Sequence, residues 1–198
     1  MSFDALALPA VVVVALAAVL LLVSADWRLS ITVLAILYVG VFMLVALSWP
    51  VEMAVVKLVA GWMSGAVLGM ALIGLPEDTR QQVRMSTATS MFRLMVAGLV
   101  LLVAISLAPK MWEWIPKIAP VQAYGGAILI GLGLLHLGLT AHPLRVTLGL
   151  LTVLGGFEIL YAAVEDSTLV TGLMAGVDLG LALLGAYLIS LPLLGEAG

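Results

Sequence analysis

Three ionisable residues lie well inside long apolar runs of the sequence, namely Lys57, Glu158 and Asp178. A charge at the centre of a membrane helix costs about 2.5–3.5 kcal/mol on insertion scales, so three of them in one chain need a reason. A lysine beside two carboxylic acids can pair with them, and the proton affinities of such a group are strongly coupled. Because proton transfer requires groups of this kind, we interpret the three residues as a candidate ion relay.

The depth of the three residues supports this interpretation. Counted from the nearer end of each apolar run at about 1.5 Å per residue, Lys57 and Glu158 lie roughly 10 Å inside the membrane and Asp178 roughly 15 Å inside. Each residue alone also has a structural explanation: Lys57 can extend its ammonium to the surface, Glu158 can sit nearer a helix end, and Asp178 can be a hydrogen-bonding acid. Taken together, their similar depth favours a functional group.

Three further residues could extend the relay. Tyr161 and Glu165 follow Glu158 by three and seven residues, so they share one helix face and outline a polar track to the outer surface. His136 lies in the fifth apolar run and could pass protons between the cytoplasm and the deeper acids. A lone histidine in an apolar run is equally well explained as a hydrogen-bonded packing residue.

The composition indicates which elements must position these residues. Of 198 residues, 64% are hydrophobic and 10% are charged, and the mean hydropathy is +1.28. A soluble domain has about 25% charged residues, so the sequence predicts an all-α integral membrane protein. Spans need about 20 apolar residues each. Seven such runs are present: 5–24, 29–48, 51–75, 89–108, 121–141, 145–164 and 168–192.

The short connections leave no room for a soluble domain, so residues 1–198 are expected to form one transmembrane domain. The chain has no cysteine, which excludes disulfides and cysteine-ligated metals or clusters, and its two histidines form no evident ligand cluster. No metal or cofactor is therefore expected. "MWEWIP" (111–116) is typical of an aromatic belt at a membrane surface, with a short interfacial helix as one alternative.

The basic residues predict an orientation, because cytoplasmic loops carry more Lys and Arg. With seven spans, five arginines fall on one side and two lysines on the other, which puts the N-terminus outside and the C-terminus in the cytoplasm. The arginines are Arg28, Arg80, Arg84, Arg93 and Arg145, and the lysines are Lys110 and Lys117. His142 and Arg145 are interpreted as ordinary interface residues at a helix start.

Two glycine stripes predict close helix contacts, because small residues let backbones approach closely in lipid. Gly61, Gly65 and Gly69 recur every four residues in the third run. Gly172, Gly176 and Gly180 do so in the seventh run. The partner of each stripe is either another helix of the chain or a neighbouring subunit.

The last three runs resemble a known family. "GFEILYAA" (156–163) is similar to a segment of the small three-helix K-type protein of NADH:quinone oxidoreductase (complex I), a module that also occurs in multisubunit cation/proton antiporters. On that match residues 121–194 form a three-helix K-like module, and Glu158 takes the place of the family's proton-transfer glutamate. "GLALL" (180–184) resembles the end of the family's third helix, with Asp178 about two residues out of register from the family's second acid.

The whole length is more similar to component E of the hydrogenase-4 and formate hydrogenlyase complexes, in which extra helices precede a K-like module. "RLS" (28–30), "VKL" (56–58) and Asp178 stand at similar places, and residues 1–110 would be the extra four-helix part. The orientation predicted from the basic residues agrees with that of the K-like module in the family.

The resemblance implies a membrane subunit of a complex I-related, proton- or sodium-translocating assembly in the cytoplasmic membrane of a prokaryote. It would catalyse no bond chemistry alone and would lie in the lipid bilayer beside antiporter-like subunits. Redox cofactors would belong to other subunits, and no nucleic acid partner is expected. Two rivals remain open: a structural or assembly subunit of a respiratory or photosynthetic complex, and a small independent transporter.

Overall fold

A computed structural model describes residues 4–75, 87–115 and 117–196 of the chain, and in these ranges it contains helices and no strand. The seven helices begin and end within a few residues of most of the predicted runs. They are α1 (Asp4–Val23), α2 (Trp27–Val45), α3 (Val51–Ile73), α5 (Thr87–Trp114), α6 (Pro120–Gly138), α7 (Pro143–Ala162) and α8 (Thr168–Glu196). The all-helical prediction is confirmed for this part of the chain.

Six of these helices, α2, α3 and α5 to α8, contain stretches that are long and apolar enough to cross a membrane. In α1, the residues Ala7–Val23 form a shorter apolar helix. The structure therefore agrees with a multi-pass helical membrane protein. That α1 is a seventh span stays a prediction.

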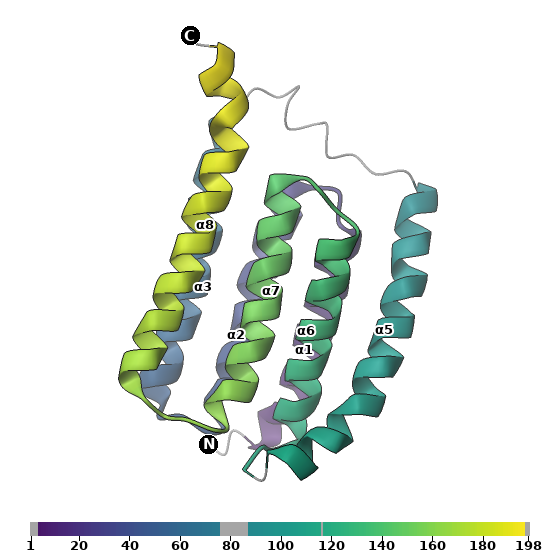
Figure 1. Ribbon diagram of the computed structural model, residues 1–198, viewed down its shortest axis with the longest axis vertical. Helices are drawn as coiled ribbons and strands as arrows, with labels where there is room; N and C mark the ends of the chain where they lie inside the picture. Colours follow the sequence, from purple (N-terminus) through teal and green to yellow (C-terminus); the bar gives the residue numbers. More distant parts are fainter. Residues whose placement is uncertain (1–3, 76–86, 116, 197–198) are drawn as a thin grey trace.

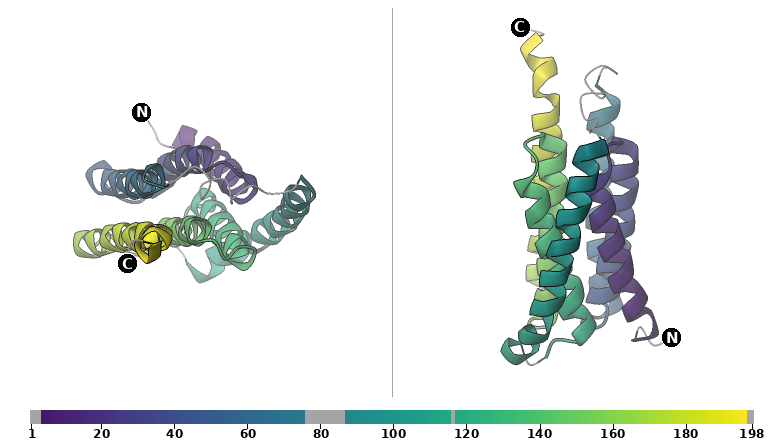
Figure 2. Two further views of the ribbon diagram at one scale, coloured as in Figure 1. Left: turned by 90° about the horizontal axis from the view of Figure 1, so that it is seen from above. Right: turned by 90° about the vertical axis from the view of Figure 1, so that its right-hand side faces the viewer.

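The helices form two layers that face each other (Figure 2). One layer contains α1, α2 and α3, the other contains α6, α7 and α8, and α5 stands at one end beside α6. Across the layers α1 packs on α6, α2 on α7 and α3 on α8. Each facing pair runs in the same direction, and the start of α1 and the end of α8 lie at opposite ends of the bundle (Figure 1).

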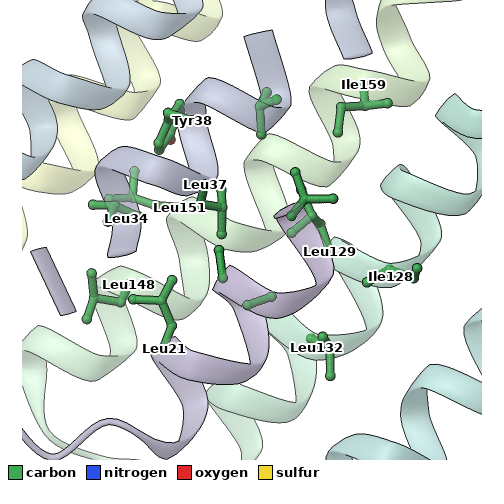
Figure 3. Close-up of a cluster of buried hydrophobic side chains, with 14 of the residues drawn as sticks. Leu21, Leu34, Leu37, Tyr38, Ile128, Leu129, Leu132, Leu148, Leu151 and Ile159 are labelled. Atoms are coloured by element: carbon green, nitrogen blue, oxygen red, sulfur yellow. The ribbon is translucent and has the colours of Figure 1, made fainter. Parts of the chain in front are cut away.

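The apolar core lies between the layers, where α1 and α2 meet α6 and α7. Figure 3 shows its side chains, which include Leu21, Leu34, Leu37, Leu129, Leu132, Leu148 and Leu151. All seven are buried to within 1% of full burial. Lipid tails are as apolar as leucine, so this packing stabilises the bundle mainly by close van der Waals contact.

Close glycine contacts hold α6 against α7. Gly126 lies opposite Gly156, where an added Cβ on Gly156 would be 2.9 Å from the Gly126 carbonyl oxygen. Gly133 lies opposite Gly149, seven residues further along α6. An added Cβ on Gly133 would be 3.1 Å from the Gly149 carbonyl oxygen. The pairs share a spacing of seven residues on each antiparallel helix, so this contact runs for about two turns.

The two predicted glycine stripes differ in their contacts. In α3, Gly61 packs against the ring of Tyr38, and a Cβ added at Gly65 would lie 3.8 Å from the side chains of Ile31 and Leu34 in α2, so this stripe is an internal helix contact. In α8, a Cβ added at Gly172, Gly176 or Gly180 would meet nothing within 4 Å. The α8 stripe therefore packs on no described part of this chain.

The fourth predicted run ends differently from the expectation. Helix α5 does not stop at residue 108 but continues through Pro109 to Trp114, so "MWEW" is the last turn of a long helix and not a separate interfacial one. Proline removes one backbone hydrogen bond and bends a helix without having to end it. The Trp114 side chain is 76% exposed, as an aromatic belt residue would be.

The described basic residues divide between the two ends of the bundle. Arg28, Arg93 and Arg145 lie near helix termini at one end, which is the arginine end (Figure 1). Lys110 and Lys117 lie at the other, which is the lysine end. Five arginines are predicted on one side of the membrane, and two of them, Arg80 and Arg84, lie outside the described residues.

Candidate functional site

A buried ion pair joins the two layers. Lys57 of α3 and Glu158 of α7 form a salt bridge between Nζ and Oε1, and both side chains are fully buried. Lys57 therefore does not extend its ammonium to the surface, so the structural alternative for this residue is wrong. The ammonium stays inside because its helix face, continued by Gly61, packs against the bundle interior.

A second polar pair lies beside the first. The Tyr38 hydroxyl of α2 donates a hydrogen bond of 2.8 Å to Oδ1 of Asp178 in α8, and both residues are fully buried. The Tyr38 ring lies in the space that Gly61 leaves, since a Cβ there would overlap the ring. Glycine at position 61 thus leaves room for the Tyr38 side chain of α2 to reach Asp178 of α8.

The four residues form one group, which we call the buried charge cluster: Tyr38, Lys57, Glu158 and Asp178. They come from four different helices, and the charges of Glu158 and Asp178 act on each other and on Lys57. The cluster contains two carboxyl groups against one ammonium. Removal of an unpaired charge from water is very costly, so a fully ionised pair of acids is strongly disfavoured there.

The cluster leaves two oxygen atoms unused. Glu158 Oε2 and Asp178 Oδ2 are buried and have no hydrogen-bond partner. Ser64 Oγ, two helical turns beyond Lys57 on α3, is likewise buried without a partner. Buried polar atoms are normally satisfied, so these atoms mark places where a proton or a water molecule would be bound.

The predicted outward track does not reach the cluster. Tyr161 is half-buried and stacks on Phe157, a residue that is 46% exposed, with ring centroids 6.0 Å apart. Glu165 is exposed, and its backbone oxygen accepts a 2.7 Å hydrogen bond from Trp49 Nε1. Among the described residues no hydrogen bond or ion pair joins either side chain to Glu158, and Glu165 lies beyond the end of α7 at Ala162.

A polar hollow of about 290 Å³ opens at the lysine end, where α7 finishes. Its lining includes Ser48, Lys117, Glu165 and Asp166. Ala162 also lines it, one helical turn after Glu158.

His136 lies away from the cluster. It is buried near the arginine end, and the charged groups that act on it are Arg145 and Arg93. Its Nε2 has no hydrogen-bond partner. The structure brings together Lys57, Glu158 and Asp178, for which the sequence predicts only a similar depth, and leaves His136, Tyr161 and Glu165 apart from them.

Sequence reasoning missed Tyr38 and the contacts of two arginines. Tyr38 stands in an apolar run with no charge nearby in sequence, and the one available signal was Gly61, whose missing side chain makes room for a large ring. The pattern of basic residues assigns Arg93 only to the orientation and Arg145 also to an ordinary interface position at a helix start. Both are instead buried, and their side chains donate hydrogen bonds to backbone oxygens of other helices and loops.

Within the described residues no three His, Asp or Glu side chains gather as a metal site requires. Comparison of the chain with protein-family models, with curated proteins and with solved structures found no match.

Proposed function

We propose that this chain is a membrane subunit of a complex I-related, ion-translocating assembly, in which the buried charge cluster relays protons. The observation that carries the proposal is the meeting of Tyr38, Lys57, Glu158 and Asp178 at full burial, from four helices. Four helices must be held in register to assemble such a group. A purely structural packing site of the same volume would be as stable with apolar residues.

The arrangement suggests how a proton would move. With Lys57 positively charged, the cluster is neutral when Glu158 and Asp178 hold one proton between them. Their unpartnered oxygens, Oε2 and Oδ2, are the free acceptors for it. Release of that proton leaves an excess negative charge, which the low-dielectric surroundings disfavour. A movement of Lys57 at another step of the assembly's cycle would therefore change the proton affinity of both acids.

The test is the Glu158→Gln variant in the assembled complex of the native membrane. We expect redox turnover to continue while proton translocation per turnover falls at least tenfold, because glutamine cannot carry a proton in this range. Translocation is measured by acidification of the medium, and an immunoblot checks that the variant chain is present at the normal level. Glu52→Gln, an exposed change at the start of α3, is the matched control and should behave as wild type. Unchanged translocation in Glu158→Gln contradicts the relay.

One observation favours the alternative of a structural subunit: the open α8 glycine stripe suits a helix of a neighbouring protein. On that alternative, replacing both members of the ion pair by apolar residues in a Lys57→Met/Glu158→Leu variant should preserve translocation once the complex assembles. The relay requires that this variant, once assembled, no longer translocate protons.

We further propose that α1 is a seventh span and that the arginine end is cytoplasmic, in the inner membrane of a prokaryote. Since the chain contains no cysteine, single cysteines can report on the orientation without background. We expect a membrane-impermeant maleimide to label Asp166→Cys in intact cells and Ala141→Cys only after permeabilisation, both positions being exposed. The reverse pattern would overturn the orientation.

A further inference from the structure

The arginine end contains two buried guanidinium groups that act as neighbouring charges. Arg93 of α5 donates from Nη1 to the Leu22 carbonyl oxygen at 3.1 Å and from Nη2 to the Leu139 carbonyl oxygen at 2.9 Å. Arg145 of α7 donates from Nη2 to the Ser24 carbonyl oxygen at 2.5 Å. These oxygens belong to the final turns of α1 and α6 or directly follow them, so the arginines stabilise the negative ends of two helices.

The carbonyl contacts do not neutralise the two positive charges. Among the described residues no carboxylate pairs with either guanidinium, since the ion pair found there is that of Lys57 with Glu158. Two like charges at short range repel each other, and burial strengthens the repulsion. An anion placed between the two side chains would remove it.

Unused donors are present at the same place. Arg145 Nη1, His136 Nε2 and His142 Nδ1 are buried and have no hydrogen-bond partner. Burial and the nearby charge of Arg145 lower the pKa of His142, so this histidine stays neutral at pH 7 and adds hydrogen-bonding capacity without more charge. An unsatisfied buried donor costs about 1–3 kcal/mol, which a bound oxyanion would offset.

The surroundings indicate which anion fits. The group lies at helix termini, beside the loops at residues 24–26 and 139–142. The ends of membrane-spanning helices are where phospholipid headgroups are expected. Beside Arg93, α5 presents Met91, Phe92 and Met95 outward, with exposures of 65%, 56% and 75%. These side chains offer an apolar surface along which acyl chains can extend from a headgroup held by the arginines.

We infer that Arg93, Arg145, His136 and His142 form a binding site for the phosphate headgroup of an anionic phospholipid. Guanidinium groups match phosphate geometry with paired donors, and basic pockets between helices on the cytoplasmic side suit anionic headgroups. A zwitterionic lipid is disfavoured because its own ammonium or choline would meet two positive charges. This site is independent of the proposed relay, whose residues are different.

The test measures lipid binding by the purified full chain in mild detergent. Native mass spectrometry and thermal unfolding are followed with phosphatidylglycerol, phosphatidylcholine or inorganic phosphate added. We expect one phosphatidylglycerol to be retained per chain and to raise the unfolding temperature, with phosphatidylcholine giving neither effect. Equal retention of the two lipids overturns the inference, and so does stabilisation by inorganic phosphate alone at equal concentration.

Variants locate the site. Arg145→Gln should weaken phosphatidylglycerol binding roughly tenfold, because one charged hydrogen-bonding group is lost. Arg28→Gln is the matched control, since Arg28 is an exposed arginine at the same end that lies over Trp27. If Arg145→Gln does not fold, His142→Gln serves instead, because His142 holds no helix-end carbonyl, and it should weaken binding severalfold. Equal loss in the Arg28 variant would show a diffuse surface effect and contradict the site.

Discussion

Replacement of Glu158 by leucine is expected to destabilise the bundle by about 3 kcal/mol, the low end of the range for a broken buried ion pair, because Lys57 loses its salt-bridge partner and keeps only the nearby charge of Asp178. Both side chains are fully buried, so no solvent screens the loss. The double variant Lys57→Met/Glu158→Leu should recover most of that stability. Apolar residues of similar volume fill the same space, and Asp178 can take up a proton when the lysine charge is gone.

The measurement is a double-mutant cycle on the purified chain, with unfolding by denaturing detergent followed by circular dichroism. Lys57→Met alone should be less harmful than Glu158→Leu alone, since a carboxyl group can neutralise itself by binding a proton. Glu52→Leu, an exposed change on α3, should shift stability by less than about 0.5 kcal/mol. Near-additive single changes would show that the pair is not coupled in the folded protein.

The second large effect is expected at the contact between α6 and α7. In Gly156→Ala the new Cβ would lie 2.8 Å from the backbone nitrogen of Ile130 and 2.9 Å from the Gly126 carbonyl oxygen. Both are backbone atoms, so neither can turn aside and the helices must separate. We expect a loss of at least about 1–3 kcal/mol, the usual range for an overfilled interior.

Two glycines of the same chain serve as controls for this change. Gly98 in α5 and Gly176 in α8 have nothing within 4 Å of an added Cβ. Gly98→Ala and Gly176→Ala should leave stability unchanged or raise it slightly, because alanine favours a helix more than glycine does. Equal effects at positions 156 and 98 would mean that helix propensity, and not the close contact, decides the outcome.

The number and limits of most helices follow from the sequence because apolar runs of span length and breaks such as Pro50 and Pro143 are local signals. Lys57, Glu158 and Asp178 could be identified as a group because charge stands out against apolar surroundings. Their depth along three helices then follows from the helical rise alone.

What could not be predicted depends on rotation and on contacts distant in sequence. Nothing local distinguishes the α3 stripe at Gly61, which packs on α2, from the α8 stripe at Gly176, which packs on no described helix. Tyr161 shares a face with Glu158 by spacing, yet the offset of about 60° between residues three apart is enough for it to stack on Phe157. The pairing of Tyr38 with Asp178 spans 140 residues, which no periodicity reveals.

The ion pair between Lys57 and Glu158 has a consequence for the order of synthesis. Because α3 and α7 are not neighbours in the chain, the partner of Lys57 is made 101 residues later. At roughly 5–20 residues per second, α3 would wait about 5–20 s before Glu158 emerges. During that interval the lysine has no counter-charge from α7, so we expect α3 to settle at its final depth only when the second layer arrives.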